Sequence, residues 1–263
     1  MFSCAGVVYE LTPEAKSIHD NLAEYVNAER IELLKNTKYQ TPAFIFSGEE
    51  PGSNILIIGG THGNEPAGYE AALRLLKRFY QHPLKKGKIV LIPEANRVSV
   101  LNYERRVPVP QGVDIEKGNL NRCYPGDENG LPMQQMAAAI QNLAIENKVN
   151  VFIDLHEALN YHLDIEETAE QKGLGQTIIY TPNEPSTWLV MNMMDKINSE
   201  ISELNQKFTA LERPILNSAA WWAGNHLGIA AFTFETSRKN PIEMRIKHHL
   251  RLVDIVLETE NVY

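Results

Sequence analysis

The chain contains Asn54-Ile-Leu-Ile-Ile-Gly-Gly-Thr-His-Gly-Asn-Glu-Pro-Ala-Gly68, an apolar run that passes directly into a glycine-rich turn. Residues 54–58 are short, unbroken and mostly β-branched, which is typical of a strand covered on both faces. The glycines that follow permit a tight turn, and Pro66 suits the first turn of a helix. The pattern predicts a strand, a loop and a helix, and ligands bind in such loops at the carboxyl edge of an α/β sheet.

The predicted loop presents His62 and Glu65 three residues apart. A glycine-rich turn before a helix can bind phosphate, but this loop has neither the Gly-Lys-Ser/Thr ending nor the G-x-G-x-x-G spacing of phosphate loops. Imidazole and carboxylate are instead ligand types that suit zinc. The spacing alone is a weak signal because many chains contain it by chance, so a metal site needs a third ligand elsewhere.

The rest of the chain reads as helices that alternate with strands, and one unit combines the strand at 54–58, the helix at 66–81 and the strand at 88–92. Such a β-α-β unit favours a parallel pair of strands. Further helices are expected at 13–35, 133–147, 187–204 and 241–258, and further strands at 43–46, 149–154, 177–180 and 229–234. We expect a hairpin-like turn at 48–52 and an unusually long loop at 93–132, which favours a functional role for that loop.

Composition and charge limit the classes of partner. At 263 residues, with 43% apolar and 22% charged residues, the chain fits one ordinary globular α/β domain. A net charge of -8 argues against nucleic acid, and no apolar run approaches the length of a membrane span. Cys4 and Cys123 lack a C-x-x-C spacing, and residues 1–10 lack the basic start of a secretory signal. We therefore expect a cytoplasmic protein that acts on a small molecule or a peptide.

Two more candidate groups follow predicted strands. His156 comes after the strand at 149–154, on the same edge of the sheet as His62. Together with Glu65 it completes two imidazoles and one carboxylate, the ligand set of catalytic zinc sites that keep a fourth position for water. Glu235 follows the last strand, where a carboxylate is either a helix cap or a functional group. In the second case it can accept a proton from water whose pKa zinc has lowered.

Four motifs in this order, over most of the chain, resemble the zinc carboxypeptidase superfamily: His62-Gly-Asn-Glu65, Asn121-Arg122, Asp154-Leu-His156 and Phe232-Thr-Phe-Glu235. The loop at 60–65 and the run at 119–122 most resemble its succinylglutamate desuccinylase and aspartoacylase branch. The resemblance implies a three-layer α/β/α fold with a mostly parallel mixed sheet. It also implies one zinc ion per chain, held by His62, Glu65 and His156, with Glu235 as general acid/base.

The same resemblance implies that Asn121 and Arg122 hold a substrate carboxylate, since the planar fork of arginine matches a carboxylate and asparagine adds a neutral donor. An upstream arginine would polarise the scissile carbonyl. Arg105 and Arg106 both qualify, and we prefer Arg106 because a short extended segment follows it. The expected activity is hydrolysis of an amide bond next to a free carboxylate, by an N-acylamino acid deacylase. A metallocarboxypeptidase acting on short peptides and a non-catalytic binding protein for an acidic metabolite stay open.

The chain departs from those relatives in two places. Asn119 stands where they have an aspartate that accepts a hydrogen bond from the first zinc histidine, so we expect weaker zinc binding here and expect Asn119→Asp to strengthen it. About 28 residues follow Glu235, too few for the small β domain of the relatives, so we expect one catalytic domain over 1–263 with an open pocket. Trp221, Trp222 and His226 lie either at its rim or in the core, and the oligomeric state stays open.

Overall fold

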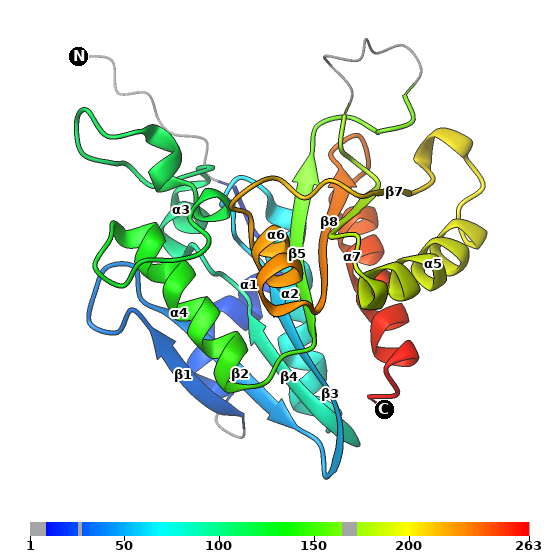
Figure 1. Ribbon diagram of the computed structural model, residues 1–263, viewed down its shortest axis with the longest axis horizontal. Helices are drawn as coiled ribbons and strands as arrows, with labels where there is room; N and C mark the ends of the chain where they lie inside the picture. The colour runs from blue at the N-terminus through cyan, green and yellow to red at the C-terminus, as the bar shows by residue number, and fades with distance from the viewer. Residues whose placement is uncertain (1–8, 26–27, 165–172, 263) are drawn as a thin grey trace.

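The computed structural model describes residues 9–25, 28–164 and 173–262, in which eight strands form one sheet (Figure 1). The strands are β1 (Glu29–Leu33), β2 (Thr41–Ser47), β3 (Glu50–Ile58), β4 (Lys86–Ile92), β5 (Val151–Ala158), β6 (Thr177–Tyr180), β7 (Thr209–Leu211) and β8 (Ala230–Ser237). The helices are α1 (Pro13–Asp20), α2 (Pro66–Gln81), α3 (Arg97–Asn102), α4 (Pro132–Glu146), α5 (Glu184–Ser199), α6 (Ala219–Trp222) and α7 (Ile242–Thr259). Cys4 and most of the segment considered above as a secretory signal lie outside the described residues.

The sheet is mixed, and its centre is parallel. The strand order is β1-β2-β4-β3-β5-β8-β6-β7. The neighbours β4, β3, β5 and β8 run parallel to one another, whereas β2 is antiparallel to β1 and β4, and β6 is antiparallel to β8. The mostly parallel mixed sheet predicted from the sequence is therefore confirmed. Because parallel strands end at the same edge, the carboxyl ends of β3, β5 and β8 lie side by side.

Helices cover both faces of the sheet because its central strands are apolar on both faces. Ile55 and Ile57 of β3 belong to the apolar cluster that contains residues of α1, α2, α5 and α7. Leu56 and Ile58 belong to the opposite cluster, with residues of α4 and α6. Figure 1 shows α4 and α6 in front of the sheet and α2 behind it. An unbroken apolar strand whose residues alternate between two cores requires cover on both sides, so the predicted three-layer α/β/α fold is confirmed.

Two predicted elements near the N-terminus are wrong. The helix expected at 13–35 ends at Asp20, and residues 29–33 form β1, which pairs with β2. In β1, apolar Ile31 and Leu33 alternate with charged residues, and this period of two suits an edge strand. The turn at 48–52 does not close a hairpin, because β4 lies between β2 and β3. The chain passes the end of β4 there, where the Gly48 amide donates to the carbonyl of Gly87 at 2.9 Å.

Several other boundaries differ from the sequence prediction. The long loop expected at 93–132 contains the short helix α3 and two 3-10 turns, and the short edge strand β7 was not anticipated. Strands β5 and β8 run further than predicted, so His156 and Glu235 lie within them and are direct partners across the ladder. Among the described helices, none has the length and apolar content required to cross a bilayer.

Candidate metal centre

The loop after β3 is held in a fixed shape by the segment that follows β4. Gly60 has a φ of +69°, and its carbonyl accepts from the Asn96 amide at 2.9 Å. Gly63, between the two candidate ligands, packs so closely on α3 that a Cβ there would lie 1.9 Å from the carbonyl oxygen of Ser99. The glycines are therefore required by close backbone approach, and they bring His62 and Glu65 to the carboxyl edge of the sheet.

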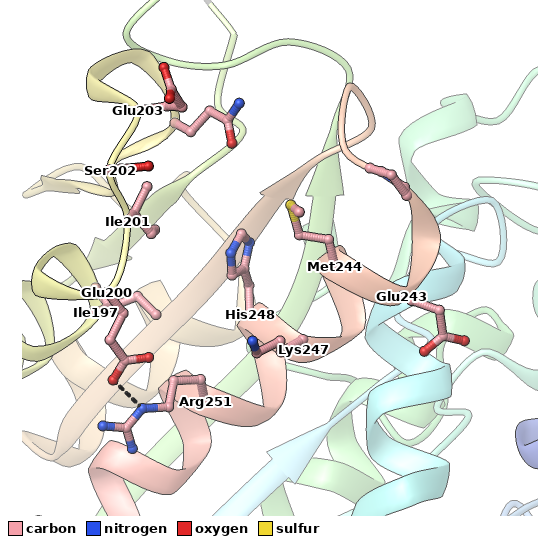
Figure 2. A pocket seen from close by; sticks show the side chains of 12 residues that line it. Ile197, Glu200, Ile201, Ser202, Glu203, Glu243, Met244, Lys247, His248 and Arg251 are labelled. Carbon is pink, nitrogen blue, oxygen red and sulfur yellow. Dashed lines mark hydrogen bonds and ion pairs between the residues drawn. The ribbon is translucent and has the colours of Figure 1, made fainter.

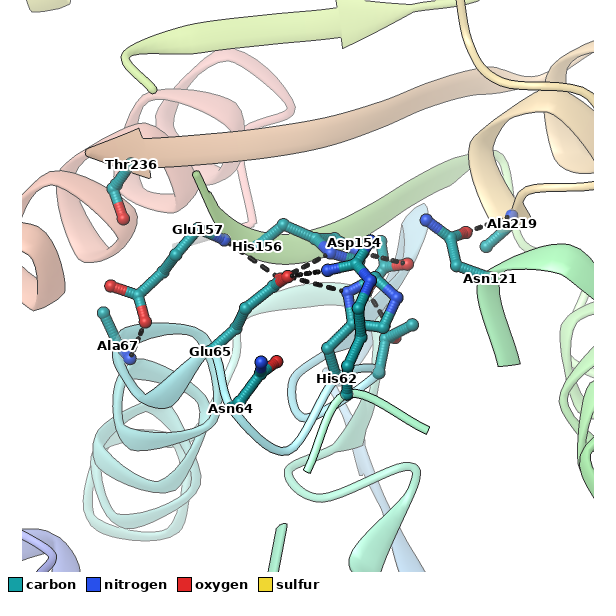
Figure 3. Close-up of polar contacts among 12 residues, drawn as sticks. His62, Asn64, Glu65, Ala67, Asn121, Asp154, His156, Glu157, Ala219 and Thr236 are labelled. Atoms are coloured by element: carbon teal, nitrogen blue, oxygen red, sulfur yellow. Dashed lines mark hydrogen bonds and ion pairs between the residues drawn. The ribbon is translucent and has the colours of Figure 1, made fainter. Parts of the chain in front are cut away.

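The three predicted ligands converge at that edge. The ligand atoms of His62, Glu65 and His156 all lie within 4.8 Å of one another, and all three residues are buried. His62 Nδ1 is 2.9 Å from one carboxylate oxygen of Glu65, and His156 Nδ1 is 2.9 Å from the other (Figure 3). The Glu65 carboxylate is thus shared by a neighbour in its own loop and by His156, which is 91 positions away in the chain. Two imidazoles and one carboxylate are the ligand set that zinc prefers in hydrolytic sites.

The outer nitrogens of both rings face acceptors. His62 Nε2 is 2.9 Å from Asn119 Oδ1, which also accepts from the Asn121 amide at 3.1 Å. His156 Nε2 lies 2.8 Å from Asp154 Oδ2, and Asp154 Oδ1 accepts from Thr61 Oγ1 at 2.8 Å. Oxygen acceptors thus lie beside both Nε2 atoms, although the His156–Asp154 pair is at ion-pair distance without hydrogen-bond geometry. Ring protons on the Nε2 atoms would leave the two Nδ1 lone pairs free to bind a cation beside the Glu65 carboxylate. A cation between them satisfies all three groups, so the donor set fits a metal ion.

Electrostatics around the trio follow from burial and close charges. Burial alone raises the pKa of Glu65, but His62 and His156 hold it well below its usual range. Burial lowers the pKa of His62. For His156, burial acts in the same direction, yet the charges of Asp154 and Glu65 raise its pKa well above the usual range. The two acids therefore favour positive charge at this edge, which suits a cation.

Glu235 faces the trio from β8. It lies opposite His156 in the β5–β8 ladder and is 9% exposed. Among the described residues, its Oε2 atom is buried without a hydrogen-bond partner. Burial raises the pKa of Glu235 to about 8, against the lowering effect of His156. A buried carboxyl group with a free oxygen and a pKa near neutrality is suited to proton transfer.

The two candidate arginines differ in what they contact. The Arg105 guanidinium donates to Glu65 at 2.6 Å, so Arg105 reaches the trio. The Arg106 side chain instead pairs with Glu116. The geometry thus favours Arg105 as the arginine beside the reacting group, although Arg106 was preferred from the sequence. The role of either arginine stays a prediction.

The predicted carboxylate anchor lies in the 3-10 turn Leu120–Arg122, against the start of α6. Asn121 Oδ1 accepts from the Ala219 amide at 3.0 Å, which fixes the asparagine side chain (Figure 3). Arg122 is partly buried, and burial lowers its pKa, with Arg105 and Arg106 acting in the same direction. Three guanidinium groups are thus near enough to influence one another, and this part of the edge suits an anion.

Other residues near the edge divide into core and surface. Trp222 is buried and stacks on Tyr124 with ring centroids 6.0 Å apart, so it belongs to the core. Trp221 is partly buried, and its ring lies 5.0 Å from that of exposed His226. Sequence reasoning missed Glu157, whose amide donates to Glu65 Oε2 at 3.1 Å. Its position directly after the third ligand was the available signal.

A separate groove lies between α5 and α7, away from the trio (Figure 2). Its volume is about 530 Å³, and its lining includes His248, Lys247 and the ion pair of Arg251 with Glu200 at 2.7 Å. His248 is fixed by Gln176, whose amide nitrogen lies 3.2 Å from His248 Nδ1. The groove contains none of the predicted site residues, so the chemistry belongs to the carboxyl edge.

Comparisons with known proteins agree on the fold. A family model described as the succinylglutamate desuccinylase/aspartoacylase catalytic domain matches residues 51–251. The N-alpha-acetyl-L-2,4-diaminobutyric acid deacetylase of Halomonas elongata is 29% identical over 105 residues, which cover 40% of this chain and 28% of that protein. Tripeptide-bound Csd4 from Helicobacter pylori superposes with a TM-score of 0.70 at 19% identity, covering 84% of this chain and 55% of that one. An aspartoacylase family protein from Mesorhizobium loti gives 0.63 at 22% identity, covering 89% and 67%. The chain thus spans only part of these proteins.

Proposed function

We propose that this chain, which belongs to the succinylglutamate desuccinylase/aspartoacylase family, is a zinc-dependent hydrolase of amide bonds next to a free carboxylate. The observation that carries the proposal is the shared carboxylate of Glu65, with the Nδ1 atoms of His62 and His156 on its two oxygens. We assign one zinc ion per chain to these three residues. The Halomonas relative, named as the deacetylase of an N-acetylated amino acid, supports a deacylase over a carboxypeptidase.

The substrate would be held by its carboxylate. Asn121 and Arg122 form a neutral donor beside a cationic fork, and the bond from Ala219 keeps the Asn121 amide nitrogen turned away from the helix. The scissile carbonyl would then lie near Arg105, whose guanidinium already reaches Glu65 and can donate to the oxygen that becomes negative during attack. This arrangement requires a carboxylate close to the cleaved amide.

Glu235 supplies the proton transfers. Zinc, when bound, would lower the pKa of water and polarise the carbonyl. Glu235 takes the proton of the attacking water through its unpartnered oxygen and later gives it to the departing amine. Burial raises the pKa of Glu235, which lets the group hold that proton between the two transfers, and the charge of a bound zinc ion would favour the carboxylate form that the first transfer requires. A binding protein would have no use for such a base.

The test is hydrolysis of a panel by metal-free and zinc-reloaded protein. We expect N-acylamino acids to be cleaved only after about one zinc per chain is restored. The matched control is the methyl ester of the best substrate, which keeps the amide and removes the carboxylate that Arg122 would bind. Equal turnover of acid and ester, or of metal-free and reloaded protein, would contradict the proposal. Turnover of peptides but not of N-acylamino acids would make the protein a carboxypeptidase.

A further inference from the structure

We propose that Glu157 is the positioning residue that fixes Glu65 against His156, an inference that rests on the metal site of the proposed function. Glu157 is adjacent to the third ligand, and its side chain is fully buried. It does not touch the region between the two imidazole Nδ1 atoms, so its action would be indirect. Figure 3 shows its carboxylate directed at Ala67 and away from His62.

Two bonds from one residue hold the same ligand. The main-chain amide of Glu157 donates to Glu65 Oε2 at 3.1 Å. Its side-chain Oε2 accepts from the amide of Ala67 at 3.0 Å, in the first turn of α2. The first bond orients the Glu65 carboxylate, and the second holds the helix that begins directly after Glu65. Glu157 thus connects β5, which carries His156, to the Glu65 carboxylate and to the first turn of the helix that follows Glu65.

Arg245 of α7 completes the arrangement. Its guanidinium pairs with the second carboxylate oxygen of Glu157. The Arg245 side chain is 13% exposed, so the ion pair is largely removed from water. A buried carboxylate without this partner would carry a large desolvation cost. The ion pair therefore connects the contact between β5 and α2 to a third element, α7.

Such a junction matters because metal affinity depends on ligand placement within about 0.2 Å. Glu65 and His156 are 91 residues apart in the chain, and Glu65 Oε2 lies 2.9 Å from His156 Nδ1. Strand pairing fixes His156, whereas Glu65 lies at the end of a loop. Without the Glu157 side chain, the hydrogen bond from β5 to the first turn of α2 would be lost, and the Glu65 carboxylate would keep Arg105 and the Glu157 main-chain amide as donors. We therefore expect metal affinity to fall while the fold persists.

The test compares two double variants that both remove the buried ion pair. Glu157→Gln with Arg245→Met keeps an acceptor for the Ala67 amide, and Glu157→Ala with Arg245→Met removes it. The readouts are the zinc dissociation constant, from competition with a chelator, and the visible spectrum of the Co²⁺-loaded protein. We expect the alanine form to bind zinc about 10–100-fold more weakly than the glutamine form and to give an altered Co²⁺ spectrum.

The matched control is Arg78→Met. Arg78 of α2 pairs with Asp254 of α7 at 2.6 Å, so it joins the same two helices far from the ligand loop. We expect this variant to lose thermal stability with less than about a twofold change in zinc affinity. Equal zinc affinity of the two double variants would overturn the proposal. So would an Arg78→Met effect as large as that of the alanine form, because the role would then be general stability.

The single variant Glu157→Gln decides the question if the alanine form does not fold. Its amide has one oxygen, so either Ala67 or Arg245 must face a nitrogen, and we expect zinc binding at least about fivefold weaker than wild type. An unchanged dissociation constant would overturn the positioning role. Failure of the wild-type protein to bind zinc is a different result, because it would remove the metal site itself.

Discussion

Replacing Asn119 by aspartate alone should not strengthen zinc binding, whereas combining it with Glu116→Gln should. From the sequence, Asn119→Asp is expected to add charge to the acceptor of His62 and so to raise affinity. The structure adds a second contact, since Asn119 Nδ2 donates to Glu116 Oε2 at 2.7 Å. An aspartate would lose this donor and place two carboxylate oxygens face to face.

The sizes of two opposing energies decide whether Asn119→Asp strengthens or weakens zinc binding. Two unit charges 2.7 Å apart repel by about 6 kcal/mol at an effective dielectric constant of about 20. Solvent weakens this, because 40% of the Glu116 side chain is exposed, and Arg106 pairs with it. Even about a third of that repulsion, some 2 kcal/mol, exceeds the gain of about 1–1.5 kcal/mol from a charged rather than neutral acceptor on His62. In the double variant, the amide introduced by Glu116→Gln supplies a donor to the new carboxylate, so the gain survives.

The assay is zinc titration against a chelator of known affinity for wild type, both single variants and the double variant. We expect Asn119→Asp to be unchanged or weaker, and the double variant to bind zinc about five- to tenfold more tightly than wild type. Thermal melting of the metal-free proteins controls for folding. Equal zinc affinity of Asn119→Asp and the double variant would contradict the expected repulsion, because Glu116 would then not be the partner of residue 119.

Three further outcomes follow from the same geometry. Glu235→Gln should retain about one zinc per chain yet lower kcat by about 10²–10⁴-fold, since glutamine keeps the shape of the buried carboxyl group but cannot act as the base. Wild-type turnover by this variant would exclude Glu235 as the general base. Arg105→Met should lower kcat more than Arg106→Met does, because only Arg105 reaches Glu65 in the structure; the reverse order in kcat measurements would restore the sequence preference. Burial lowers the pKa of His248 to about 4, so the stability that its neutral form contributes is present above pH 6.5 and is lost as pH falls toward 4. The unfolding free energy should drop by about 2 kcal/mol more between pH 7 and 5 in wild type than in His248→Asn. Identical pH dependence of the two proteins would contradict this.

The sequence predicted the convergence of the ligands because local rules place them. An apolar strand followed by glycines positions His62 at the carboxyl edge, and a second apolar strand positions His156 there. Parallel strands share that edge, and the two histidines lie close together because β3 and β5 are neighbours in the sheet. Their burial and the shared Glu65 carboxylate agree with that expectation.

The sequence could not predict contacts that depend on the conformations of long side chains. Arg105 and Arg106 are adjacent, and the choice between Glu65 and Glu116 as their partners is made by packing, not by spacing. The position of Glu157 after His156 could point to the site, but its contacts could not be predicted, because its partners Ala67 and Arg245 come from distant elements. The edge strand β1 was predicted as helix because apolar positions spread over a long window suit both periods: Ile18, Leu22, Tyr25, Ile31 and Leu34.

The most direct test of the metal centre is anomalous diffraction at the zinc edge from crystals grown with about one equivalent of zinc per chain. We expect a single strong peak bound by the Nδ1 atoms of His62 and His156 and by the carboxylate of Glu65. A strongest peak elsewhere on the protein, or coordination through the Nε2 atoms that now face Asn119 and Asp154, would contradict it.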